Sequence, residues 1–214
     1  MTGGMKLKKF GVLLFVVLIS LFSLPLMPEA KQDSCLSEAS IMAREEMRTL
    51  WTDHVFYTRN YIISEVDGLE DTDVVLARLL QNQKDIGNAI KPYYGEKAGD
   101  KLADLLTEHI ILAGKIVGAA KGGKSAQVEQ LNKEWYQNAD DIARFLSNAN
   151  PYWSDKKLKD LLYMHLQFVT DEAVARINKD WKANIKSFDE GKAHILHLSD
   201  ALSDGILKQF PEKF

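Results

Sequence analysis

Cysteine, proline and net charge are all scarce in this chain of 214 residues, and each scarcity excludes a class of protein. The single cysteine, Cys35, excludes a fold held by internal disulfides, and it is either a free thiol or the link of a disulfide-bonded dimer. The formal net charge of −3 provides no electrostatic attraction to nucleic acid. Only five prolines interrupt the chain, and no alternating strand pattern of useful length occurs.

Sequence motifs that identify common enzymes are also lacking. Asp71-Thr72-Asp73 resembles a metal-dependent glycosyltransferase signature, but it opens a predicted helix, where such residues cap free N–H groups. Gly122-Gly123-Lys124-Ser125 ends like a phosphate-binding loop, yet the first glycine at the required spacing is missing. No serine nucleophile elbow, haem-attachment motif or Rossmann glycine pattern occurs. These absences favour a non-catalytic protein.

The longest apolar run lies near the N-terminus, between Phe10 and Met27, and three lysines precede it. A basic start followed by about 18 apolar residues predicts either a cleaved signal peptide or a retained membrane anchor over residues 1–30. In both cases the lysines stay in the cytoplasm and the rest of the chain lies outside it. We therefore expect an extracytoplasmic protein, secreted or anchored to the cell membrane.

Beyond a short linker over residues 31–36, apolar residues recur every three to four positions, which predicts a single all-α domain over residues 37–214. Capping residues, glycines and prolines divide it into six expected helices, over residues 37–66, 71–91, 96–120, 125–147, 154–186 and 189–209. Short connections favour antiparallel neighbours. We expect an up-down four-helix-bundle-like core, made by the first, third, fourth and fifth helices, with one or two additional flanking helices.

Polar residues interrupt the apolar faces near the middle of four predicted helices: His54, His109, Asn138 with Asp141, and His165. Mid-helix positions share a layer in an up-down bundle, so these side chains are expected to converge. Imidazoles with a carboxylate suit zinc, iron or copper, which makes the five residues a candidate metal site. Buried histidines that hydrogen-bond to each other or to an asparagine would instead form a structural polar layer.

Two further groups of polar residues are expected to face solvent. The second predicted helix carries Asn82, Gln83, Asp85 and Asn88 on one side, with a buried polar network as the alternative. His194 and His197 lie one turn apart on the last helix. That spacing can chelate a metal, but both histidines border an apolar face, which favours a solvated helix edge.

Five segments together reach across nearly the whole chain after the leader: LWTDHVFYTRNY (50–61), DIGNAI (85–90), PYYG (92–95), NADDIA (138–143) and QFP (209–211). They resemble an uncharacterised family of exported all-helical proteins of Gram-positive, often spore-forming, bacteria. The resemblance implies export and a helical fold, and it implies no reaction.

The sequence thus predicts an exported or membrane-anchored helical-bundle protein, non-catalytic and either structural or ligand-binding, in the cell envelope or outside it. The first alternative is a metal-binding bundle, for redox chemistry or metal handling, that uses the His/Asn/Asp site. The second is a protein–protein interaction scaffold. The expected partners are the membrane, if the N-terminal segment is retained, and a metal ion under the first alternative.

Overall fold

The computed structural model describes residues 1–3 and 37–214. The chain divides into two units, Met1–Cys35 and Leu36–Phe214, and the described helices all belong to the second. The predicted leader from residue 4 onward, the predicted linker and Cys35 lie outside the described residues. Among the described helices, none is long and apolar enough to cross a membrane.

Residues 37–214 form six α-helices and one short 3-10 helix, with no strand among them, which confirms the predicted all-α fold. The α-helices are α1 (Glu38–Asp67), α2 (Thr72–Tyr94), α3 (Glu96–Lys121), α4 (Ser125–Ala149), α5 (Asp155–Ile177) and α6 (Trp181–Gln209). The 3-10 helix, Pro211–Lys213, follows α6 directly.

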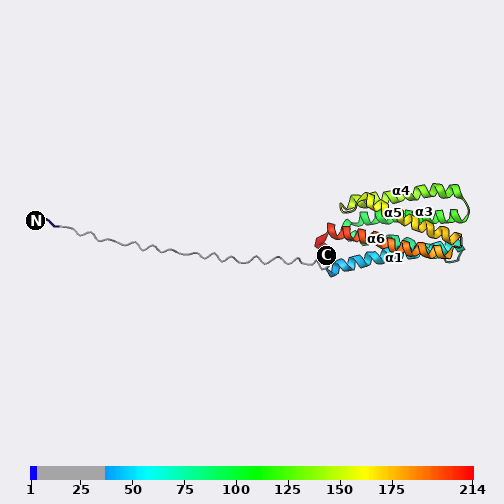
Figure 1. The fold of residues 1–214 in the computed structure, drawn as a ribbon, viewed down its shortest axis with the longest axis horizontal. Helices are drawn as coiled ribbons and strands as arrows, with labels where there is room; N and C mark the ends of the chain where they lie inside the picture. Colours follow the sequence, from blue (N-terminus) through cyan, green and yellow to red (C-terminus); the bar gives the residue numbers. More distant parts are fainter. Residues whose placement is uncertain (4–36) are drawn as a thin grey trace. The chain divides into compact units, whose positions relative to one another are not determined.

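Consecutive helices run up and down and pack as neighbours, and α6 returns to contact α1, so the six helices close a circle (Figure 1). In addition, α1, α3 and α5 contact one another across the centre. The bundle-like core is confirmed, and α2 and α6 belong to it, since Ile86 and Ile195 are each 0% exposed. We describe the domain as three helical hairpins: the first is α1–α2, the second α3–α4 and the third α5–α6.

Several helix ends follow the capping signals in the sequence, but Asp71, which was expected to cap the second helix, makes no side-chain cap hydrogen bond. Ser37 accepts the backbone N–H of Ser40 at 3.1 Å and so starts α1. Gly68, with a φ of 70°, ends α1 in the left-handed conformation that glycine adopts without strain. Gly95 and Gly123, with φ of 83° and 68°, allow the tight connections from α2 to α3 and from α3 to α4.

The boundary between the last two helices differs from the prediction. A helix over residues 154–186 is wrong, because α5 ends at Ile177 and the chain turns at Lys179, which has a φ of 58°. Asp180 then starts α6 by accepting the Ala183 N–H at 3.0 Å. Gly191 is not a helix end but lies inside α6, where an added Cβ would be 3.2 Å from that of Phe168. It therefore permits close packing of α6 on α5.

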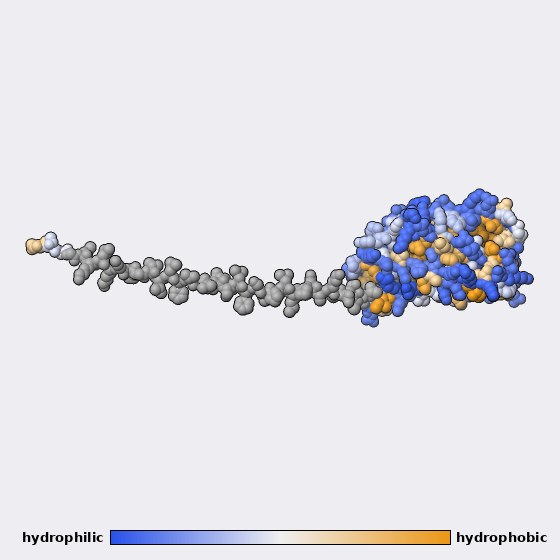
Figure 2. All heavy atoms as spheres, viewed as in Figure 1, coloured by the Kyte–Doolittle hydropathy of each residue, from blue (hydrophilic) through white to orange (hydrophobic). Residues whose placement is uncertain are grey.

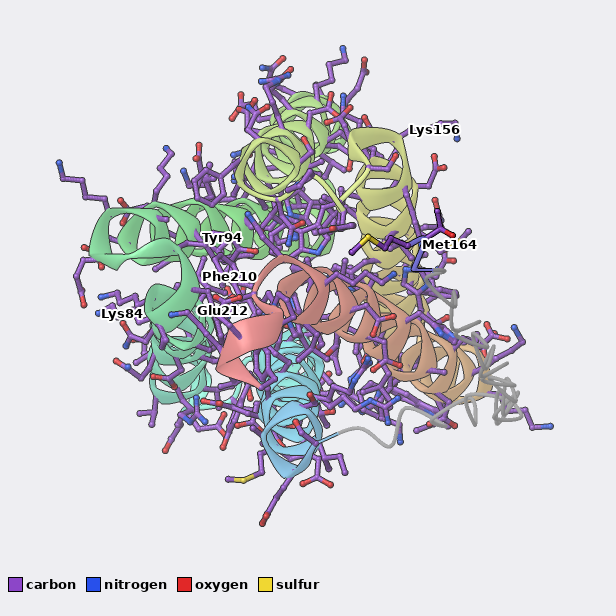
Figure 3. The ribbon with its side chains drawn as sticks, turned by 90° about the vertical axis from the view of Figure 1, so that its left-hand side faces the viewer. Lys84, Tyr94, Lys156, Met164, Phe210 and Glu212 are labelled. Atoms are coloured by element: carbon purple, nitrogen blue, oxygen red, sulfur yellow. The ribbon has the colours of Figure 1, made fainter. Side chains whose placement is uncertain are left out.

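One end of the bundle is packed with aromatic side chains. Figure 3 looks onto this end, where the rings of Tyr94 and Phe210 lie 5.3 Å apart. The Trp153 indole packs against Tyr94 and donates a hydrogen bond to the Ala201 carbonyl oxygen at 3.2 Å. An added Cβ at Gly205 would lie only 1.9 Å from the Trp153 Nε1 atom.

On the outside, hydrophilic residues cover most of the visible face of the domain, with apolar residues scattered among them (Figure 2).

Candidate functional site

The three histidines predicted to share a layer do so, and we call His54, His109 and His165 the histidine layer. They lie near the middle of α1, α3 and α5, and their exposed fractions are 1%, 3% and 3%. These are the three helices that contact one another across the centre of the bundle. The His54 and His165 imidazole centres are 5.3 Å apart, and the His109 and His165 centres are 6.2 Å apart.

Hydrogen bonds from α2 fix the tautomer of His54. The side-chain amide of Gln83 donates to the Leu79 carbonyl oxygen at 2.8 Å and to Asn82 Oδ1 at 3.1 Å. Its oxygen, Oε1, therefore faces His54 Nδ1 at 3.3 Å. An amide oxygen only accepts, so His54 carries its proton on Nδ1 and leaves Nε2 as a lone-pair acceptor.

His109 receives equivalent support from α4. Asn138 donates its amide N–H to the Leu105 carbonyl oxygen at 3.0 Å, so its oxygen faces His109 Nδ1 at 2.9 Å. His109 is therefore also protonated on Nδ1. The indole of Trp135 packs beside it, with the ring centres 5.2 Å apart.

His165 is hydrogen-bonded to His54 but keeps one ring nitrogen without a partner. His54 Nε2 and His165 Nε2 are 3.3 Å apart. Because His54 Nε2 is an acceptor, His165 must donate from Nε2, which leaves its Nδ1 as a bare acceptor. That Nδ1 is buried and has no hydrogen-bond partner among the described residues.

Burial keeps all three imidazoles neutral. It lowers the pKa of His54 to about 3, and the neighbouring His109 lowers it further while the Gln83 hydrogen bond opposes the shift. Burial lowers the pKa of His109 to about 4, against the opposing effect of the hydrogen bond that His109 donates to Asn138. The pKa of His165 lies well below its ordinary value, first through burial and then through His54 and His109. The layer is therefore a set of neutral donors and acceptors at ordinary pH.

Asp141 does not join the histidine layer, although Asn138 does. Its carboxylate lies on the outside of α4, where Arg144 donates to it at 2.8 Å and Gln137 at 3.1 Å. Within residues 37–214, no group of three or more His, Cys, Asp or Glu side chains is arranged to hold a metal ion. The candidate metal site of the sequence is thus reduced to the three imidazoles and the Asn138 amide.

Two residues of α2 belong to the site and were expected on the surface. Asn82 and Gln83 are each 0% exposed, so the expectation of a solvated face is wrong for them, whereas Asn88 is exposed. Asn82 anchors the network by donating to the Leu50 carbonyl oxygen at 3.0 Å. The signal that could have placed Gln83 is its position near the middle of α2, at the level of the other layer residues.

An internal repeat underlies this arrangement. Residues 101–109 and 157–165 share the pattern Lys-Leu-x-Asp-Leu-Leu-x-x-His, and residues 50–54 read Leu-Trp-x-x-His. The second helices of the first two hairpins share Gln-Asn-x-x-Asp-Ile, at residues 81–86 and 137–142. Both copies make the same surface bond from the glutamine to the aspartate four residues on. Asp141 is thus the counterpart of Asp85, and both form surface pairs.

The hydrogen bonds repeat with the sequence. In each hairpin, a polar side chain of the second helix donates to the carbonyl oxygen of the leucine four residues before the layer histidine: Asn82 to Leu50, Asn138 to Leu105 and His194 to Leu161. The paired residues are separated by 32, 33 and 33 residues. His194 is half-buried by this contact, whereas His197 is exposed, as predicted for a helix edge.

No protein-family description matches the chain, and no curated protein or solved structure matches it either. The hydrogen-bonding pattern of the repeat is therefore the main guide to what the site does.

Proposed function

We propose that the protein is a non-catalytic, extracytoplasmic helical-bundle protein in which the histidine layer is a structural element that holds paired helices in register. The observation that carries this proposal is the buried network in which Gln83 and Asn138 fix the tautomers of two layer histidines. A neutral imidazole with a fixed tautomer accepts a hydrogen bond only from one direction. A shift of the two helices of the first or the second hairpin against each other would leave these buried polar atoms without partners, and a shift of the third hairpin along the first would break the bond between His54 and His165.

The extracytoplasmic location rests on the sequence alone. Fractionation of cells followed by N-terminal sequencing tests it directly. We expect the protein outside the cytoplasm, either beginning near Lys31 or still carrying the apolar segment. A soluble cytoplasmic form with an intact N-terminus would contradict the proposal.

A second candidate function is metal binding, and one distance favours it. Two nitrogen ligands each about 2.05 Å from a tetrahedral ion are about 3.3 Å apart, and the two Nε2 atoms of His54 and His165 are separated by 3.3 Å. His54 and His109 also donate their Nδ1 protons to amide oxygens. This is how histidines that ligate metals through Nε2 are commonly oriented. To supply a third nitrogen, the imidazole of His109 would have to turn towards the ion held by His54 and His165.

Thermal melting of chelator-stripped protein, with and without zinc, copper or iron, separates the two functions. A structural layer predicts the same melting temperature in every case. Metal binding at about 100 times the dissociation constant would instead add about 2.7 kcal/mol to the free energy of unfolding. The gain would vanish in His54→Ala and His165→Ala, and it would fall below pH 6 as protons compete for the imidazoles. Such a gain would contradict the structural proposal.

A further inference from the structure

The repeat makes three equivalent junctions between hairpins, on the side of the histidine layer away from the aromatic end, and two of them are filled by side chains. Between the first and second hairpins, Tyr61, Leu79 and Ile110 form a small buried cluster. The fit around Tyr61 is close, because a Cβ added at Gly114 would be 2.9 Å from its hydroxyl oxygen. Side chains therefore pack this junction closely.

The junction between the third and first hairpins is filled by a buried ion pair. Arg59 Nη1 donates to Glu172 Oε1 at 2.7 Å, and the two side chains are 15% and 6% exposed. The guanidinium also lies over the ring of Phe188, 4.6 Å from its centre. This junction is thus closed by charge and by an aromatic side chain rather than by a tyrosine.

The junction between the second and third hairpins is not filled. A cavity of about 70 Å³ lies among α3, α4 and α5. Six of its lining residues define it: Ile116, Ala120, Val128, Trp135, Ala173 and Val174. No charged side chain lines it, and the one hydroxyl present, on Thr170, already donates to the Leu166 carbonyl oxygen. Val174 is 47% exposed, so the cavity has a wall that reaches the surface.

One tryptophan, Trp135, lies in the cavity wall. Trp135 is 2% exposed, and its indole N–H has no acceptor among residues 37–214. Trp51 also has a buried N–H without an acceptor, but the cavity that it lines measures only about 10 Å³ and is too small for an organic ligand.

We propose that this cavity binds the end of an uncharged aliphatic chain. The apolar wall favours an aliphatic ligand. The absence of charged lining residues favours an uncharged one, since a bare charge would be costly to bury there. The volume is about half that of a cavity of about 150 Å³ that accepts benzene, so a narrow chain fits better than a ring. This inference goes beyond the structural role of the histidine layer, and either proposal can fail alone.

Fluorescence quenching tests the proposal, because bromine quenches a tryptophan that it touches. The probe is 8-bromo-1-octanol, titrated into the folded full-length domain at a concentration below that at which the alcohol forms droplets. We expect saturable quenching, and we expect the saturable part to be lost in Trp135→Phe. Quenching that rises linearly without saturation, or that is unchanged in Trp135→Phe, would overturn the proposal.

Filling the cavity provides the matched comparison. Ala120→Leu adds three carbon atoms at the cavity wall, whereas Ala201→Leu adds the same atoms on α6, away from it. We expect Ala120→Leu to weaken probe binding at least about tenfold, or about 1.4 kcal/mol, and Ala201→Leu to leave it unchanged. Circular dichroism melting shows whether each variant is folded. If Ala120→Leu does not fold, Val174→Leu at the exposed wall takes its place. Equal binding by a folded cavity-filling variant and by the wild type would overturn the proposal.

Discussion

The first two hairpins and the third share one plan but complete it differently. In the first two, an amide on the second helix faces the layer histidine and fixes its tautomer. In the third, His194 bonds only to the Leu161 carbonyl oxygen, and His165 keeps a buried Nδ1 without a partner among the described residues. Two hairpins therefore hold their histidines in fixed tautomers, and the third supplies a histidine whose proton position is set by His54 alone. The comparison teaches that one unpaired nitrogen, His165 Nδ1, is tolerated when the other two layer histidines are held by hydrogen bonds.

The largest expected effect concerns acid. The three layer histidines have folded-state pKa values below the unfolded value of 6.5, so their contribution to stability is present above pH 6.5 and is lost as the pH falls. Glu172 acts in the opposite sense. Burial raises its pKa to about 7 against the effect of Arg59, so its contribution is present below its unfolded value of 4.5 and is lost as the pH rises through 7.

Between pH 6 and pH 5 the unfolded chain therefore binds about two more protons than the folded one, three on the histidines against one on Glu172. Urea unfolding should show the free energy of unfolding falling by about 2.7 kcal/mol over that pH unit. The control variant is His197→Asn, because His197 is exposed and lies outside the histidine layer. A flat profile would mean that the histidine layer is not kept neutral.

The next effect compares the second hairpin with the third. Asn138→Leu removes the acceptor for the buried His109 Nδ1–H, and we expect a loss of about 1–3 kcal/mol in the free energy of unfolding. His194→Leu removes a bond to a backbone carbonyl at a half-buried site, and we expect a loss below about 1 kcal/mol. Chemical denaturation of both variants at pH 7.5 gives the two numbers. Equal losses would remove the distinction between the hairpins.

The smallest effect compares two junctions. Gly114→Ala places a methyl group 2.9 Å from the Tyr61 hydroxyl oxygen, so the tyrosine must shift, and we expect a loss of about 1–2 kcal/mol. Ala120→Leu at the open junction should change the free energy of unfolding by less than about 0.5 kcal/mol, because its added atoms enter a cavity. The same denaturation experiment measures both. A larger loss in Ala120→Leu than in Gly114→Ala would show that the open junction is already tightly packed.

Much of the fold followed from the periodicity of apolar residues, since it decides which face of each helix is buried. The same rule placed His54, His109 and His165 inside, because each is flanked by apolar residues at helical spacing. The same rule wrongly placed Asp141 inside the bundle. It lies three residues from Asn138, a rotation of about 60° around the helix axis, and that rotation turns its carboxylate to the surface.

Other features could not be predicted from short stretches of sequence. The turn at Lys179 contains neither glycine nor proline, so the strongest turn signals are absent there, although Asp180 caps the helix that follows. Gln83 was assigned to solvent because glutamine usually lies there, and only the position of its partner His54 on another helix explains its burial. The cavity beside Trp135 depends on the joint volumes of three helices, which no single stretch of sequence contains.

The contact between α6 and α1 brings the start and the end of the helical domain together. With six antiparallel helices, α1 begins at the same end of the bundle at which α6 finishes, and the two helices are bound side by side by the paired hydrogen bonds from Arg48 to Asp200. A short glycine-serine linker could join them, and new termini could be opened in the loop between α3 and α4. Such a circular permutant retains every helix–helix interface. We therefore expect that the stability of the fold does not depend on the order of the hairpins along the chain.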